Sequence, residues 1–295
     1  MATIYTHKDS NIAKTWLLMF VFFVVVIGLG WSASWYFNNP SILFVAVIVS
    51  VAMNIGSYWF SDKLVLSMSG AHPADERQYA DLHNIVENLS ITAGLPKPRL
   101  CIINDPAPNA FATGRDATHA VVAVTTGLLS MLDRAELEGV IAHELSHVGN
   151  RDMLVMTVVV VLVGFITLLS DFFLRASMFG GGDRDNKASG IIMIAGFVLA
   201  LLSPIIGMLI QLAVSRKREF LADASGALLT RYPEGLASAL QKIASYGGAM
   251  QKANHATAHL FISNPFGARG IQGTLNKLFS THPPVEERVK ALLNR

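Results

Sequence analysis

Charge and cysteine are scarce in this sequence of 295 residues. Only 15% of the residues are charged, against about 25% in average soluble proteins, and 52% are hydrophobic. This composition excludes a disordered chain and argues against an ordinary soluble globular protein. The 23 basic and 21 acidic residues leave a formal charge of +2, too balanced for a nucleic-acid partner. Cys101 is the one cysteine, so the chain forms no internal disulfide, which suits a reducing compartment.

Aspartate, glutamate, lysine, arginine and histidine are all absent from residues 15–61. This stretch is too long for a single membrane-spanning helix, which needs about 20 residues. We therefore expect two transmembrane helices that break at Asn38, Asn39 and Pro40, a cluster of turn-forming residues. A cleavable signal peptide is a poor alternative, because its apolar part has only roughly 7 to 15 residues.

Two later apolar runs, at 153–170 and 188–215, predict a second transmembrane hairpin. A hairpin buried inside a soluble core is the alternative. Basic residues cluster at one end of the four expected spans. The loop between the last two spans is an exception, because it also carries basic residues at the opposite end. This pattern places both termini and both polar regions in the cytoplasm. The clustered basic residues are Lys8, Lys14, Lys63, Arg151, Arg216, Lys217 and Arg218.

The chain thus divides into five segments, and its polar parts are expected to form one domain that the second hairpin interrupts. Apolar spacing predicts helices over 74–92, 215–229 and 233–246, and a last short helix after Pro284. Strands are expected at 100–103 and 119–124, with 109–114 as an edge strand. The expected fold is mainly α with a small β-sheet. The segments are a cytoplasmic N-terminal segment at 1–14, two transmembrane helices at 15–61, a first polar part at 62–152, a transmembrane hairpin at 153–215 and a second polar part at 216–295.

A helix that begins at Asp133, with Glu136 as its capping partner, carries the sequence HELSH. His143 and His147 are one turn apart, so both imidazoles project from one face and can hold one zinc ion. Glu144 lies next to the first histidine, where it can take a proton from a metal-bound water. The alternative is a helix with two solvent-facing histidines and an incidental glutamate.

A catalytic zinc site needs a third protein ligand and an open position for water. Glu219 is the candidate. His147 lies six residues before the third expected span and Glu219 four residues after the fourth, and a helical hairpin brings both to the same membrane surface. Asp223, one turn beyond, can accept a hydrogen bond from a ligand histidine. The alternative is an exposed acidic helix start that balances Arg216 and Arg218.

Five motifs, in order along nearly the whole chain, resemble the HtpX family of membrane zinc metalloproteases, bacterial relatives of the CAAX prenyl proteases. The resemblance implies a gluzincin fold in which His143, His147 and Glu219 hold zinc, Glu144 is the base and Asp223 supports a ligand. It also implies that the substrates are misfolded or damaged membrane proteins, cleaved on the cytoplasmic side during stress. The motifs are NAFATG at 109–114, TTGLL at 125–129, HELSH at 143–147, SRKREFLADASGA at 215–227 and THPPVEER at 281–288.

Two other motif segments have weaker chemical roles. His282 could donate a hydrogen bond to the oxyanion of the reaction, and Arg288 could hold this histidine or assist with the same charge. The alternative for His282 is an ordinary loop histidine. Asn109, Ala110 and Phe111 could pair through edge-strand backbone with an extended peptide substrate. A packing role for Phe111 is the alternative.

The sequence therefore predicts a zinc metalloendopeptidase, a multi-pass protein of the bacterial plasma membrane with its active site in the cytoplasm. The expected partners are one zinc ion per chain, unfolded or membrane-protein substrates and the lipid bilayer. A scaffold with structural zinc is disfavoured, because such sites are closed by four ligands and rich in cysteine. A transporter is disfavoured as well, since the four expected spans have no ionisable residue at mid-depth.

Overall fold

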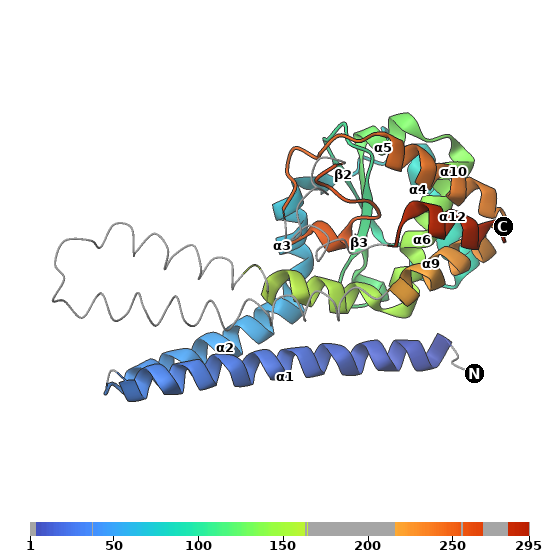
Figure 1. Ribbon diagram of the computed structural model, residues 1–295. Coiled ribbons are helices and arrows are strands. Elements are labelled where there is room, and N and C mark those ends of the chain that lie inside the picture. The colour runs from blue at the N-terminus through green and yellow to red at the C-terminus, as the bar shows by residue number, and fades with distance from the viewer. Residues whose placement is uncertain are drawn as a thin grey trace.

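A computed structural model describes residues 4–36, 38–162, 164, 216–254, 256–267 and 283–294. Its N-terminal part is a hairpin of two long helices, α1 (Ile4–Tyr36) and α2 (Ser41–Trp59), beside a compact domain (Figure 1). The predicted break between them is confirmed. Asn38 has a φ of 48°, and the side chain of Asn39 accepts a hydrogen bond from the N–H of Ser41 at 3.0 Å, which starts α2.

The apolar helices of this hairpin are candidates for membrane spans. Among the described residues, Ser10–Ser32 and Ser41–Trp59 are long and apolar enough to cross a membrane, and a bent helix pair is a third candidate. Helix α1 already begins at Ile4, so the expected polar lead at 1–14 is mostly helical. The apolar run at 188–215 lies outside the described residues, and so does the last part of the run at 153–170, residues 163 and 165–170. Large apolar side chains are exposed along the hairpin, among them Trp16, Phe20, Trp31, Trp35, Phe44 and Ile48.

The domain contains a four-stranded mixed sheet in the order β1-β2-β4-β3. Strands β2 (Arg99–Ile103) and β4 (Val121–Thr125) run parallel, and β3 (Ala110–Thr113) is antiparallel to β4 at one edge. These three strands confirm the prediction. Strand β1 (Ala71–Pro73), at the other edge, was not predicted, because three residues are too short to show an alternating pattern.

Helices make up the rest of the domain, which confirms a mostly helical fold with a small sheet. Helix α6 (Arg134–Asn150) is central. It contacts β3 and the helices α4 (Ala80–Ala93), α9 (Arg216–Thr230) and α10 (Pro233–Ser245). The predicted start of α4 at residue 74 is wrong, because the side chain of Asp75 accepts the N–H groups of Arg77 and Gln78 and forms a turn there. The domain also contains α3 (Ser61–Ser69), η1 (Ala117–His119), α5 (Thr126–Met131), η2 (Ala258–Leu260) and α12 (Val285–Leu292).

The chain bends sharply where α6 ends. Arg151 has a φ of 56°, in the left-handed region, and the helix Asp152–Leu162 leaves α6 at an angle of 84°. This helix is buried between the domain and α1. Its residues Leu154 and Val158 share an apolar cluster with Met19 and Phe22 of α1. The first candidate membrane span is therefore packed against the domain that carries the HELSH helix.

Candidate metal centre

The first turn of α6 is fixed by the predicted capping box. The carboxylate of Asp133 accepts the N–H of Glu136 at 3.0 Å, and Glu136 accepts the N–H of Asp133 at 2.9 Å. Glu136 also accepts hydrogen bonds from Ser238 and Lys242 of α10. Burial raises the pKa of Glu136, but these hydrogen bonds outweigh burial and lower it. One carboxylate thus starts α6 and fastens α10 to it.

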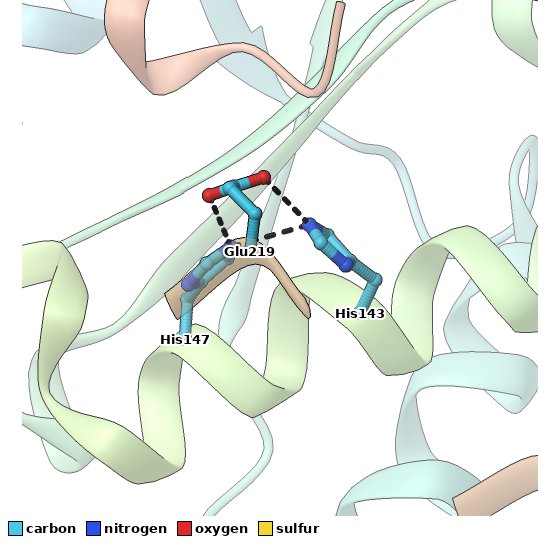
Figure 2. A group of neighbouring side chains, drawn as sticks. All are labelled: His143, His147 and Glu219. Carbon is cyan, nitrogen blue, oxygen red and sulfur yellow. Dashed lines mark hydrogen bonds and ion pairs between the residues drawn. The ribbon is translucent and has the colours of Figure 1, made fainter. Parts of the chain in front are cut away.

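Three predicted ligand residues converge inside the domain (Figure 2). His143 and His147 of α6 and Glu219 of α9 are only 1%, 5% and 3% exposed. Their ligand atoms all lie within 4.8 Å of one another. The two Nε2 atoms are 3.2 Å apart, and the Glu219 oxygens lie 3.8 Å from Nε2 of His143 and 3.6 Å from Nε2 of His147. Two imidazole nitrogens and one carboxylate are a donor set of catalytic zinc sites, so the residues present fit this metal.

A glycine lets α9 bring Glu219 to this position. A Cβ atom on Gly226 would lie 3.0 Å from the backbone nitrogen of His143 and 3.2 Å from its Cα. Such a distance is tighter than ordinary van der Waals contact, so a side chain at this position would push the two helices apart by a few tenths of an ångström. Glu219 lies two helical turns before this crossing and faces the histidines.

Asp223 and Arg288 hold His143 from behind. Oδ1 of Asp223 lies 2.9 Å from Nδ1 of His143, which leaves Nε2 pointing to the ligand cluster. Arg288 donates two hydrogen bonds to the same carboxylate, at 2.6 and 2.8 Å. Burial lowers the pKa of His143, which favours the neutral form that binds metals. Burial raises the pKa of Asp223, but the hydrogen bonds from Arg288 and His143 outweigh burial and lower it.

Arg288 has a bound partner that the sequence did not predict. Its guanidinium is 1% exposed and is bound to Asp223, while Nη1 lies 4.0 Å from Oε2 of Glu219. Burial lowers the pKa of Arg288, but the nearby carboxylates, Asp223 first, outweigh burial and raise it. Its positive charge therefore faces the cluster. His282, the other residue of this prediction, lies outside the described residues.

His147 has an acidic partner that sequence reasoning missed. Nδ1 of His147 lies 3.3 Å from Oδ2 of Asp152, a buried residue directly after the bend at Arg151. Burial lowers the pKa of His147, but the hydrogen bond with Asp152 and the charge of Glu219 outweigh burial and raise it to about 9. A ligand histidine held by a carboxylate is a stronger base towards a metal.

Glu144 is placed to handle a proton. It is buried beside the ligand histidines, and the backbone N–H of Ala112 in β3 donates a hydrogen bond to its carboxylate. Burial, with the charge of Glu219, raises the pKa of Glu144 to about 7, although the charge of His147 opposes this shift. A carboxylate with a pKa near neutrality can both take up and release a proton.

The edge of β3 is occupied by the chain itself. The carbonyl of Ala110 accepts the N–H of Ile262 at 2.9 Å, and the side-chain amide of Asn109 bonds both backbone groups of Ser263, at 3.0 and 3.2 Å. Phe111 is buried against the ring of Phe261, with ring centroids 5.0 Å apart. The packing role of Phe111 is confirmed. Peptide binding at Asn109, Ala110 and Phe111 stays a prediction, and it requires that 261–263 move aside.

Two histidines one helical turn apart, a glutamate beside the first and a glutamate from a separate helix define a metallopeptidase centre. Comparison with known proteins agrees, because residues 76–295 match the model of peptidase family M48. The "Protease HtpX homolog" of Caldanaerobacter subterraneus subsp. tengcongensis is 47% identical over 98% of this chain and 97% of that protein. The protein of the same name from Thermoanaerobacter pseudethanolicus is 48% identical, with the same coverage.

The chain therefore belongs to peptidase family M48 and is a metallopeptidase. The resemblance to HtpX proteases drawn from the sequence motifs is confirmed. Among solved structures, that of S. mikatae Ste24p is similar with a TM-score of 0.48 and 16% identity, over 98% of this chain and 67% of that chain. A structural likeness at this level is too weak to assign function.

Proposed function

We propose that this chain is an integral membrane zinc endopeptidase that cleaves misfolded or damaged membrane proteins at the cytoplasmic face of the bacterial plasma membrane. The observation that carries the proposal is the buried convergence of His143, His147 and Glu219, with Glu144 beside them. Because the cluster offers three protein ligands, a fourth position is left for water, as catalytic zinc sites require.

His143, His147 and Glu219 would hold the zinc. When bound there, zinc supplies Lewis-acid chemistry: it polarises the scissile carbonyl and acidifies a water molecule. Glu144 accepts the proton of the attacking water and passes it to the leaving amine, and its pKa of about 7 suits both directions of transfer. The N–H of Ala112 keeps the Glu144 carboxylate oriented between these steps.

Positive charge near the reacting carbonyl would stabilise the negative charge that develops on it. Arg288 provides such a charge, because Nη1 lies 4.0 Å from a ligand oxygen of Glu219. The same arginine binds Asp223 and thereby holds His143, so its role in positioning is supported more directly than a contact with substrate. His282 would add a hydrogen-bond donor to the same carbonyl oxygen.

The placement of the domain supports action at a membrane surface. The domain lies at the end of the α1–α2 hairpin where α1 begins and α2 ends (Figure 1). Lys8, Lys14 and Lys63 lie at this end, whereas the connection between α1 and α2 carries no basic residue. Basic residues favour the cytoplasmic side of a membrane, so this end would be cytoplasmic. Segments of other membrane proteins would then be within reach of the site.

The test is cleavage by the full-length protein in detergent, with its zinc content measured. We expect one zinc per chain, cutting of an unfolded model protein, loss of cutting when a chelator removes the metal and recovery when zinc is returned. A folded form of the same substrate should be cut more slowly, because an extended segment must enter the site. Zinc-loaded protein that cuts neither unfolded proteins nor reconstituted membrane proteins would overturn the proposal.

A further inference from the structure

One polar side chain of the first membrane helix reaches the metal centre. Asn11 lies on α1 at the start of the candidate span Ser10–Ser32 and is 3% exposed. Its Nδ2 donates hydrogen bonds to Oδ1 of Asp152, at 2.6 Å, and to the carbonyl of Asn150, at 3.0 Å. Burial of an amide without hydrogen bonds is costly, so these contacts fix how α1 docks on the domain.

Asp152 divides its two oxygens between the membrane helix and the metal centre. Oδ1 accepts the hydrogen bond from Asn11, and Oδ2 lies 3.3 Å from Nδ1 of His147. Arg218 of α9 completes the arrangement, with Nε 3.8 Å from Oδ1 of Asp152 and Nη1 3.4 Å from the carbonyl oxygen of the Asn11 side chain. One buried carboxylate therefore connects α1 and α9 to a ligand histidine of α6.

The two ligand histidines are held in different ways. His143 depends on Asp223 and Arg288, which both belong to the catalytic domain. Asp152, the partner of His147, follows the left-handed residue Arg151 and begins the helix that leaves α6 at 84°. Because Asp152 lies beyond the end of α6, the hydrogen bonds within α6 do not set the direction of the Asp152 carboxylate. The hydrogen bond from Asn11 holds this carboxylate from a second side.

We propose that Asn11 is a positioning residue of the metal centre. Acting through Asp152, it holds the His147 ring with Nε2 towards His143 and Glu219, so that full metal affinity requires the first membrane helix to be docked on the domain. The proposal rests on the proposed function, in which these three residues bind zinc. The partner of a ligand histidine sets the orientation of its ring. Under this proposal, α1 therefore helps to hold the His147 ring in place through Asn11 and Asp152.

The experiment compares Asn11→Ala with Thr15→Val in the full-length protein in detergent. Thr15 is a matched control, because it is a buried polar residue one turn further along α1. Among the described residues its hydroxyl bonds only the carbonyl of Asn11, within its own helix. Zinc affinity is measured by chelator competition, and ligand geometry by the visible spectrum of the cobalt(II)-substituted protein. We expect Asn11→Ala to weaken zinc binding about 10- to 100-fold and to change the cobalt spectrum. Thr15→Val should do neither.

A double-mutant cycle tests whether Asn11 acts through Asp152. Asp152→Asn should weaken zinc binding by a similar factor, and adding Asn11→Ala to it should bring little further loss, because coupled residues are not additive. Wild-type affinity and spectrum in a folded Asn11→Ala protein would overturn the proposal, and so would losses that add in full. If Asn11→Ala does not fold, full additivity between Asn11→Gln and Asp152→Asn would overturn it in the same way. Zinc binding that survives Glu219→Ala would instead overturn the proposed metal site.

Discussion

Nδ1 of His143 and Oδ1 of Asp223 lie 2.9 Å apart, in a contact that joins two helices distant in sequence. Asp223 also receives two hydrogen bonds from Arg288 of α12, so the ligand histidine is held by a chain of buried charges. Removal of one member of such a chain leaves the others without compensation. The stability of the domain and the geometry of its metal centre therefore depend on the same residues.

Arg288→Leu should lower the free energy of unfolding by about 3–5 kcal/mol, because Asp223 would remain buried without its cationic partner. Arg134→Leu is the matched control, since Arg134 is largely exposed and pairs with Glu138 on the surface, where a pair contributes less than about 1 kcal/mol. Thermal unfolding of both variants without metal measures the difference. Equal melting temperatures would show that the buried pair contributes no more than the surface pair.

Glu136→Gln should lower the free energy of unfolding by about 0.5–2 kcal/mol at neutral pH, because it removes the charge that pairs with Lys242 of α10, whereas glutamine can still accept the N–H of Asp133. The pKa of Glu136 is lowered from its ordinary value of 4.5 in the folded protein. The stabilisation by its charge is therefore present above that value and is lost as the pH falls through the folded-state pKa. Unfolding measured from neutral to acidic pH should show the two proteins converging as the pH falls below 4.5 and through the folded-state pKa. A difference that stays constant with pH would contradict the assignment.

Gly226→Val should separate α9 from α6 and lower both stability and zinc affinity, because its side chain would meet the backbone of His143. An overpacked contact costs typically about 1–3 kcal/mol. Gly149→Ala in α6 is the control, since a Cβ there would make only an ordinary contact, 3.7 Å from Leu95. This control should retain zinc and gain slightly in stability. Unchanged zinc content in a folded Gly226→Val protein would show that the close crossing does not position Glu219.

Ser263→Pro should lower the KM for unfolded protein substrates and leave kcat unchanged. Proline removes the N–H that Ser263 donates to Asn109 and so weakens the hold of 261–263 on the edge of β3. If a substrate peptide pairs with this edge, it must displace that segment. Ser263→Ala keeps the N–H and should behave as wild type. An unchanged or higher KM in Ser263→Pro would indicate that substrate binds elsewhere.

The fold was largely predictable where local signals are strong. The capping pair at Asp133 and Glu136 marked the start of α6, and the motif spacing placed His143 and His147 on one face. Glu219 followed from the logic of a hairpin that returns to the same membrane surface. Strand β1 gave no signal because it is formed by pairing with β2, and the start of α4 was misjudged because a side-chain turn replaces the first helical turn.

The support of the metal centre was less predictable, because it depends on contacts between distant parts of the chain. The link from Asn11 to Asp152 spans 141 positions, and no pattern near Asn11 distinguishes it from a polar residue at a membrane surface. The pairing of Ile262 with Ala110 is equally remote. The sequence does contain a weak signal for Asp152, because an acidic residue directly after the helix that carries the two histidines is a candidate partner for the second one. Arg288 was recognised by its motif, whereas its contact with Asp223 emerged only from the fold.

The most direct measurement compares the full-length wild type with Glu144→Gln, both purified in detergent, for cleavage of an unfolded model protein and for zinc content. The substitution keeps the shape of the side chain and removes the group that takes the proton, while the ligands His143, His147 and Glu219 are untouched. We predict equal zinc in both proteins and cleavage by the wild type alone, with a loss of at least about 100-fold in Glu144→Gln. Full activity in Glu144→Gln, with zinc bound, would contradict the account.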